Sequence, residues 1–187
     1  MQIVFTTSRR PSRRTRSLIN ELVHCIPNSF KLSRGKKSLI ELIHELISLS
    51  TKYLAVILEY KGNPRRIAFY RFYHELRRLK PLFSITMEGV KLCREIKGRV
   101  LEKHSLKDLL IDVYGCETDD CFKLADLLME ALNAKVSSAK SDVRLVLSSR
   151  DSRLIEVSFI NASGEVIGPV IKVSKVRLFE GEGENRH

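Results

Sequence analysis

The sequence repeats one order of local patterns, and that repeat constrains the fold more than any other feature. A β-branched apolar run, a loop and an amphipathic helical pattern occupy residues 2–25, and a β-hairpin pattern follows at 54–72. The same order of strand, loop and helix recurs at 110–133, again followed by a hairpin pattern at 143–161. We therefore predict an α/β fold built from two structurally similar α/β halves that arose by internal duplication.

The two copies differ by one additional segment in the first. The helical patterns align when Leu18 is paired with Leu127, and the hairpins align when Leu54 is paired with Val143, which are offsets of 109 and 89 residues. The twenty residues missing from the second copy match the length of a basic turn and a second strongly amphipathic helical pattern at residues 34–47. We expect this second helix in the first half only.

The length of 187 residues fits a single domain rather than several. We predict one domain over residues 1–180, with an N-terminal half at about 1–105 and a C-terminal half at about 106–180. Residues 181–187 lack apolar side chains and are predicted to form a disordered tail. No apolar run approaches the roughly 20 residues of a membrane span, and the first residues do not resemble a signal peptide. We therefore expect a cytoplasmic protein without a membrane partner.

The basic residues are concentrated in the first half. The chain carries 33 Lys and Arg residues against 22 Asp and Glu residues, a formal net charge of +11. Residues 1–40 hold nine basic residues and one acidic residue. Residues 41–107 hold fourteen basic residues and seven acidic residues. Residues 108–187 hold ten basic and fourteen acidic residues, a net charge of −4. This division indicates a polyanionic partner for the first half, with nucleic acid as the leading candidate.

The densest basic cluster contains five arginines within eight positions, at residues 9–16, with Pro and Ser between them. The planar guanidinium group suits bidentate contacts with phosphate better than the point charge of lysine does. Ser12 or Thr15 could cap the helix that follows, and the N–H groups at a helix start would add to the positive field. A solvent-exposed basic surface with no partner is the alternative, and the density of arginine argues against it.

Metal and cofactor sites have little support in the sequence. The four cysteines, Cys25, Cys93, Cys116 and Cys121, show none of the paired short spacings of zinc sites, and we interpret them as buried thiols in a reducing compartment. There is no GxSxG motif, no P-loop and no glycine-rich dinucleotide loop. We therefore expect no metal, no cofactor and no small-molecule substrate.

Two carboxylate pairs, Asp119 with Asp120 and Asp108 with Asp112, are candidates for two-metal cleavage of a phosphodiester. Asp119 and Asp120 are better explained as negative charge at a helix start. The acidic residues are also concentrated in the half without the basic surface, whereas a nuclease needs both near one phosphate. A metal-dependent ribonuclease is therefore the least favoured alternative.

Aromatic residues Tyr70, Phe72 and Tyr73 alternate with Arg71 on a predicted strand. Such a strand could form a stacking platform for bases. Alternating aromatic residues in a strand are more often part of a core, and we favour that interpretation. The sequence signatures of an RNP1 motif, a GXXG loop, a zinc finger and a basic zipper are absent.

The segment TTSRRPSRRTRSLINEL at residues 6–22 combines a strand end, a Ser-Arg-x-Pro-Ser loop and an arginine-rich helix start. IPNS follows at 26–29 and RGKKSLIEL at 34–42, and EVIGPVIKVSKVRLFEGE stands at 165–182. These segments resemble the Brix domain family of ribosome-biogenesis proteins, and the resemblance covers roughly residues 1–182.

The resemblance also has a finer level and two departures. FSITMEGVKLCREI at residues 83–96 and the closing EVIGP are most similar to the subfamily of the small-subunit processome, in a stand-alone version of archaeal type. The family's Gly-Pro-Thr motif is replaced by Lys80-Pro81-Leu82, and the aromatic residue expected after the closing Gly-Pro is Val170. The local turn geometry therefore need not follow the family's at these two places.

The resemblance implies a fold of two duplicated α/β halves similar to the anticodon-binding domain of class IIa aminoacyl-tRNA synthetases, in agreement with the repeat. It implies no catalysis. The implied role is binding to pre-rRNA or rRNA, and to other ribosome-assembly proteins through the other half, during rRNA processing and subunit assembly. The alternative is a protein-interaction module that docks an acidic partner of a processing complex.

We therefore predict an RNA-binding surface on the N-terminal half. Its contacts would be mainly to phosphates, so that the shape of the RNA matters more than its sequence. The candidate RNA-binding residues are Ser8, Arg9, Arg10, Ser12, Arg13, Arg14, Arg16, Arg34, Lys36 and Lys37.

Overall fold

The structure is a computed structural model that describes residues 2–96, 106–136, 141–150 and 153–179. The predicted tail at 181–187 lies outside these residues. In the described part of the chain, ten strands form one sheet, accompanied by three α-helices and one 3₁₀ helix. In chain order the elements are β1 (Ile3–Thr7), α1 (Arg13–Cys25), β2 (Ser29–Lys31), α2 (Leu39–Ser48), β3 (Tyr53–Tyr60), β4 (Asn63–Tyr73), β5 (Arg78–Lys91), the 3₁₀ helix η1 (Cys93–Glu95), β6 (Leu109–Gly115), α3 (Asp119–Leu132), β7 (Lys135–Val136), β8 (Val143–Ser148), β9 (Ile155–Asn161) and β10 (Val170–Leu178).

The two halves of the sheet have the same strand arrangement. The order is β2-β1-β3-β4-β5-β10-β9-β8-β6-β7, and the halves join where β5 and β10 pair antiparallel. In the N-terminal half β1 is parallel to β2 and β3, while β3, β4 and β5 are antiparallel. In the C-terminal half β6 is parallel to β7 and β8, while β8, β9 and β10 are antiparallel. The predicted mixed α/β class is therefore confirmed. The predicted boundary near residue 105 falls at the end of a segment outside the described residues.

Helix α1 begins at a polar cap and ends just before a proline. Ser12 is the N-cap, and its hydroxyl oxygen accepts a hydrogen bond from the Thr15 backbone N–H at 3.2 Å. The helix ends at Cys25, two residues before Pro27, as predicted. Its buried residues recur at helical spacing and form one stripe. They are Thr15, Leu18, Ile19, Glu21, Leu22 and Cys25.

Helix α3 is the counterpart of α1 and is capped by Thr118 in place of Ser12. When these two caps are superposed, the offset is 106 residues, and the fully buried Leu18 and Leu124 take the same position. The predicted pairing of Leu18 with Leu127 is therefore wrong. A shift of three residues is close to the ~3.6 residues of one helical turn, so both alignments superpose apolar stripes and only the caps distinguish them.

The hairpins β3–β4 and β8–β9 correspond at an offset of 90 residues rather than the predicted 89. Tyr53 lies beside Ile3 on β1, and Val143 lies beside Leu109 on β6. Successive side chains of a strand point to opposite faces, so an error of one residue exchanges the buried face for the outer one. The predicted pairing of Leu54 with Val143 is wrong because the apolar run of β3 is continuous and hides which face is buried.

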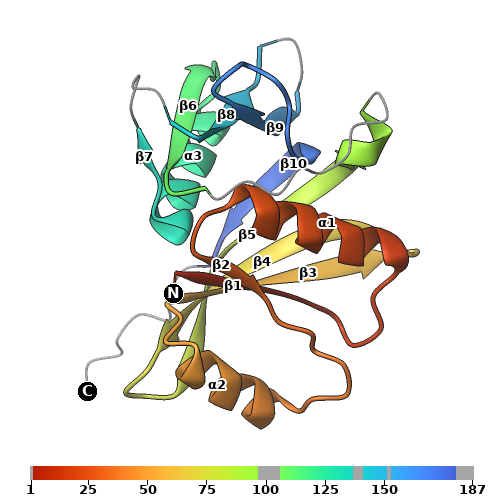
Figure 1. Ribbon diagram of the computed structural model, residues 1–187, viewed down its shortest axis with the longest axis vertical. Helices are drawn as coiled ribbons and strands as arrows, with labels where there is room; N and C mark the ends of the chain where they lie inside the picture. Colours follow the sequence, from red (N-terminus) through yellow and green to blue (C-terminus); the bar gives the residue numbers. More distant parts are fainter. Residues whose placement is uncertain (1, 97–105, 137–140, 151–152, 180–187) are drawn as a thin grey trace.

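One hydrophobic core is shared by both halves. Helices α1 and α3 pack into it, and its members include Phe5 and Leu22 from the N-terminal half and Leu128 and Phe159 from the C-terminal half. In Figure 1, α1 lies between the N-terminal strands and the C-terminal half, while α2 covers the opposite face of those strands. Buried residues of α2 and of the strands beneath it form a smaller core, consisting of Val4, Leu42, Leu46, Leu54 and Phe72. Within the described residues the C-terminal half has no counterpart of α2, as predicted, but the offsets of 106 and 90 make the missing segment 16 residues long rather than twenty.

The cysteines differ from the prediction at two positions. Cys25 and Cys93 are buried thiols, as predicted, but Cys116 and Cys121 form a disulfide. The turn into α3 brings their two Cα atoms to 5.5 Å, a separation that a disulfide can bridge. The five-residue spacing did not indicate this bond, because the two cysteines meet only when the intervening Thr118 starts a helix.

Gly168 marks a close crossing between the halves. A Cβ atom on Gly168 would lie 2.5 Å from the Sγ atom of Cys25 and 3.1 Å from the Cβ atom of Phe159. Cys25 ends α1, and Gly168 belongs to the connection from β9 to β10. Glycine therefore allows this connection to pass α1 more closely than any other residue would.

Candidate nucleic-acid interface

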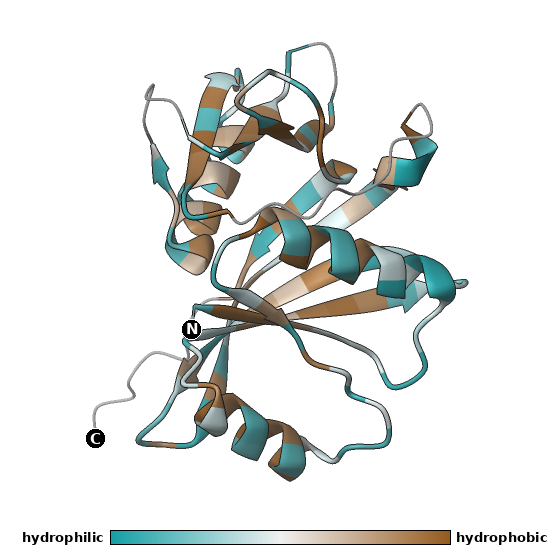
Figure 2. Ribbon diagram, viewed as in Figure 1, coloured by the Kyte–Doolittle hydropathy of each residue, from teal (hydrophilic) through white to brown (hydrophobic). Residues whose placement is uncertain are grey.

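The two predicted basic segments lie at one edge of the sheet. Strands β1 and β2 are parallel neighbours, so the loops that follow them, residues 8–12 and 32–38, leave the same edge and lead into α1 and α2. Figure 1 shows the N-terminal ends of both helices at this edge, and Figure 2 shows hydrophilic residues at the start of α1. Ligands of α/β sheets bind beyond the carboxyl ends of parallel strands. We call residues 8–16 and 34–37 together the basic edge.

Four arginines of the basic edge are exposed: Arg9, Arg10, Arg13 and Arg16. Within the described part of the chain, none of their guanidinium groups has an ion pair or a hydrogen bond. An arginine without an internal partner retains all its donors for an external anion. These four side chains therefore form the unsatisfied positive part of the edge.

Arg14 has a different role from its neighbours. Its Nη1 and Nη2 atoms bond the two carboxylate oxygens of Glu95 at 2.6 and 2.8 Å, and Nη2 also donates to the carbonyl of Val90 at 2.6 Å. These bonds tie the first turn of α1 to the end of β5 and to η1. The predicted phosphate contact of Arg14 would have to break a bidentate pair, so its geometry is that of a residue that holds the edge in place.

Ser12 is also engaged inside the protein. Its backbone N–H and its hydroxyl both donate to Oε1 of Glu59, at 2.8 and 2.6 Å. Partial burial raises the pKa of Glu59, but the hydrogen bonds from Ser12 and Thr15 and the charge of Arg16 outweigh it and lower that pKa below its usual value. A carboxylate at the end of β3 thus already occupies the anion position at the start of α1. The sequence did not reveal this partner because Glu59 is 47 residues from Ser12.

The second basic segment contains one fully exposed cation. Lys36 is exposed, Arg34 is half-buried, and Lys37 forms an ion pair with Glu45 of α2. Ser8, at the start of the first loop, is half-buried, and its backbone N–H donates to the carbonyl of Ile57 at 3.2 Å. Apart from Arg34, whose buried Nε atom has no hydrogen-bond partner among the described residues, the predicted residues divide into exposed cations and residues with internal partners.

The cap of α2 keeps the second segment in position. The Ser38 hydroxyl accepts from the Glu41 backbone N–H at 3.2 Å, and the Ser38 backbone N–H donates to the Glu41 carboxylate at 2.7 Å. This reciprocal pair is a capping box, which fixes where the helix starts. The backbone bond of Ser38 is the largest cause of the lowered pKa of Glu41.

Cations that the sequence analysis missed lie on the last strand. Lys172, Lys175 and Arg177 of β10 are exposed, although they belong to the acidic half. Thr86 of β5 pairs with Lys175 on one side and with Arg66 of β4 on the other, so these cations share the face of the sheet turned away from the common core. The alternation in β10 was visible in the sequence, but its pairing with β5 was not.

The aromatic strand residues divide between core and surface. Phe72 is 4% exposed and Tyr70 packs against the same small core beneath α2. The core interpretation is confirmed for these two. Tyr73 is 37% exposed, and the Arg71 guanidinium lies 5.6 Å from the centre of its ring.

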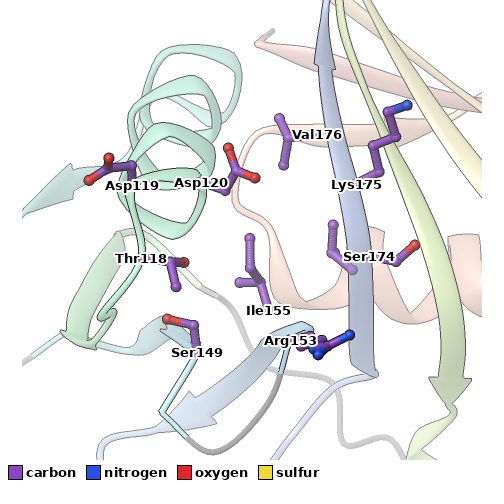
Figure 3. Close-up of a pocket in the computed structure, with 10 residues that line it drawn as sticks. Thr118, Asp119, Asp120, Ser149, Arg153, Ile155, Ser174, Lys175 and Val176 are labelled. Carbon is purple, nitrogen blue, oxygen red and sulfur yellow. The ribbon is translucent and has the colours of Figure 1, made fainter.

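The corresponding edge of the C-terminal half carries carboxylates. By superposition of the caps, Asp119 and Asp120 stand where α1 has Arg13 and Arg14, in the first turn of α3 as predicted. They line a cavity of about 370 Å³ together with Arg153 of the β8–β9 connection. Figure 3 shows Asp120 facing this space, whereas Lys175 points away from Asp120 on the other side of β10.

One member of the other predicted carboxylate pair has structural partners. Asp112 lies 3.6 Å from Arg144 of β8 and accepts a hydrogen bond from the backbone N–H of Tyr114. In the residues that the structure describes, no group of three or more His, Cys, Asp or Glu side chains is placed to hold a metal ion. No helix in the same residues has the length and apolar character to span a membrane.

Similar sequences carry one name. The chain is 31% identical over 180 residues to the probable Brix domain-containing ribosomal biogenesis protein of Aeropyrum pernix, an alignment that covers 91% of this chain and 93% of that protein. It is 30% identical over 175 residues to the protein of the same name from Methanopyrus kandleri, with 88% of each covered. A third, from Pyrobaculum aerophilum, is 34% identical over 122 residues, 65% of this chain and 66% of that protein. No protein-family model matches the chain.

Solved structures share the fold over nearly the whole chain. The crystal structure of a probable ribosomal biogenesis protein from Aeropyrum pernix superposes with a TM-score of 0.80 at 30% identity, covering 93% of this chain and 96% of that one. The crystal structure of an archaeal Imp4-like protein superposes with a TM-score of 0.69, covering 95% of this chain and 99% of that one. At 23% identity the second comparison bears on the fold alone.

Proposed function

Because the chain belongs to the Brix domain family of ribosomal biogenesis proteins, we propose that it is a ribosome-biogenesis factor that binds pre-rRNA or rRNA through the basic edge. One observation carries the RNA-binding part of this proposal. Arg9, Arg10, Arg13 and Arg16 are exposed at one edge and have no ion pair with any described residue. Guanidinium groups in this state are matched to the phosphates of a nucleic acid.

The proposed contacts are divided between two kinds of residue. The four exposed arginines and Lys36 contact phosphates directly, with Arg34 beside them. Ser12, Arg14 and Lys37 act indirectly, because each is bonded to a carboxylate of its own protein. Phosphate contacts position a protein without identifying bases, so binding depends on RNA shape and falls steeply as salt concentration rises.

The proposal includes no catalytic step and no cofactor. The names of the relatives state a biogenesis role and no reaction. Other ribosome-assembly proteins are proposed as further partners, and the cytoplasm as the site of action. The identical order and direction of strands in the two halves support an origin by internal duplication. The likeness to the anticodon-binding domain of class IIa aminoacyl-tRNA synthetases stays a prediction, which a superposition of each half on that domain tests.

Charge reversal at the basic edge tests the proposed function. The variant Arg13→Glu with Arg16→Glu should bind a structured rRNA fragment at least tenfold more weakly at moderate salt. It should also lower the slope of log affinity against log salt by about two, one for each lost phosphate contact. Filter binding across a salt series gives both quantities.

The matched control makes the same charge change in the C-terminal half. Lys123→Glu with Lys135→Glu reverses two exposed lysines, and the salt slope should change much less. An unchanged slope in the Arg13 and Arg16 variant would remove the basic edge from the RNA site. Failure of the unaltered protein to bind rRNA fragments, together with binding to an acidic partner protein, would instead support the alternative of a protein-docking module.

A further inference from the structure

We propose that a groove beside the basic edge takes one unstacked base of the bound RNA, with Tyr60 as the stacking surface. The inference rests on the proposed function and deepens it, because it names the substrate class as RNA with an unpaired nucleotide at the site. The groove has a volume of about 560 Å³, within the usual size range of ligand sites. Its walls come from Arg14 of α1, the turn between β3 and β4, and the end of β5.

Tyr60 is an exposed aromatic residue held by a tight turn. It is 63% exposed and pairs with Asn63 across the two-residue turn of Lys61 and Gly62. Both turn residues have positive φ angles, 49° and 76°, the conformation of turns that match the twist of a hairpin. Lys61 Nζ lies 5.5 Å from the ring centroid and so covers at most one of the two ring faces. An exposed ring on a tight turn, with one face free, is suited to stacking on a base.

The two guanidinium groups that line the groove are paired, unlike those of the four exposed arginines of the basic edge. Arg65 forms a bidentate pair with Glu88, with N–O distances of 2.9 and 3.0 Å, and Arg14 is bonded to Glu95. The two guanidinium charges in the groove are therefore neutralised by carboxylates. A phosphate gains little from these two guanidinium groups, whereas the carboxylate of Glu88 and the amide of Asn63 remain suited to the polar edge of a base.

The two surfaces thus divide the two tasks of RNA recognition. The unpaired Arg13 and Arg16 lie on the same first turns of α1 as Arg14, whose side chain lines the groove. Arg16 is also close enough to Glu59, the residue before Tyr60, to lower its pKa alongside the hydrogen bonds of Ser12. An RNA backbone held by the arginines therefore runs beside the groove and can direct a base into it.

The other half provides an internal contrast. Its corresponding cavity, lined by Asp119, Asp120 and Arg153, contains no aromatic residue. At the hairpin offset of 90, the position of Tyr60 is taken by Arg150, which lies 3.6 Å from Glu117. The combination of an exposed ring, a groove and unpaired arginines is specific to the N-terminal half among the described residues.

The experiment compares two RNA hairpins of equal length with the full-length protein. One is fully paired, and the other carries a single bulged 2-aminopurine whose fluorescence reports stacking. Tyr60→Ala should weaken binding to the bulged hairpin by roughly tenfold to a hundredfold and leave the paired hairpin unaffected. Tyr60→Phe, which keeps the ring, should stay within about twofold of the unaltered protein and preserve the fluorescence change.

Tyr114→Ala is the matched control, because Tyr114 is 88% exposed in the C-terminal half and should have no effect on either hairpin. Equal binding of the bulged hairpin by the unaltered protein and by Tyr60→Ala, or an equal loss for both hairpins, would overturn the inference while leaving the proposed function intact. Absence of binding to either hairpin by the unaltered protein would overturn both. Thermal unfolding of Tyr60→Ala separates loss of the ring from loss of the fold.

Discussion

The two halves of the molecule have the same strand order but opposite chemistry at corresponding edges. In each, a parallel strand leads through a short loop into a capped helix that enters the common core. The first turn of α1 contains Arg13 and Arg14, and the first turn of α3 contains Asp119 and Asp120. The fold therefore places a corresponding edge in each half, and the residues at the start of the helix determine its charge.

The halves also differ in how the outer face of the sheet is covered. In the N-terminal half, α2 packs on Val4 and Leu54, which are buried. In the C-terminal half, the outer positions of β8 and β9 include Arg144, Ser148 and Glu156, which are half-buried or exposed. The C-terminal half, which has no counterpart of α2 among the described residues, therefore has polar side chains on the outer face of its sheet.

The comparison of the two halves is tested most strongly by truncating one core side chain at equivalent positions of α1 and α3. Leu18→Ala and Leu124→Ala should each lower the free energy of unfolding by about 3 kcal/mol, because both side chains are fully buried in the same core. Urea denaturation should show one transition for both variants. The exposed Lys123→Ala should change stability by less than about 0.5 kcal/mol. Two separate transitions would show that the halves unfold independently.

A second test addresses the close crossing between the halves at Gly168. Gly168→Ala should cost about 2 kcal/mol of stability, because its new methyl group meets the Sγ atom of Cys25 at 2.5 Å. Gly89→Ala is the control, since nothing lies within 4 Å of a Cβ atom there. Combining Gly168→Ala with Cys25→Ala should restore part of the loss in a double-mutant cycle. Additive losses would mean that the contact is not what makes glycine necessary.

The smallest expected effect concerns the one carboxyl group in the buried stripe of α1. Glu21 stands where α3 has Leu127 at the offset of 106, and burial raises its pKa although the Cys93 backbone N–H donates to it at 2.8 Å. A raised pKa in the folded state means that the carboxylate form destabilises the fold. That destabilisation is present above the raised pKa and disappears as pH falls through it towards 4.5.

Glu21→Gln keeps an acceptor for Cys93 and removes the charge. At pH 7 it should therefore raise the free energy of unfolding by up to about 1 kcal/mol, and the gain should vanish near pH 4. Denaturation at both pH values measures it, with Asp126→Asn, an exposed carboxyl group of α3, as the control. A gain of equal size at both pH values would contradict a titrating Glu21.

Local patterns predicted the elements well because their causes are local. The predicted cap at Ser12 acts within a few residues, and apolar periodicity identified both hairpins. The bond between Ser12 and Glu59 and the pairing of β5 with β10 join residues far apart in the chain, and no neighbouring residue records them.

The candidate site was predicted as a segment but not residue by residue. Composition located the arginine cluster, and Arg13 and Arg16 are exposed, as the proposed phosphate contacts require. Arg14 differs because its partner Glu95 is 81 residues away, and Tyr60 was not singled out because an aromatic residue at a strand end is ordinary. Separating the arginines that are free for the proposed phosphate contacts from those with internal partners required the ion pairs of the folded chain.

The position of β10 in the sheet has a consequence for the order of synthesis. It is the last strand in chain order among the described residues, yet it lies at the centre of the sheet, between β5 and β9. A nascent chain can pair β1 to β5 early, but the two half-sheets become one only after residues 170–178 have left the ribosome. The outer face that joins Arg66 to Lys175 and Arg177 is therefore assembled last, and a truncated chain never acquires it.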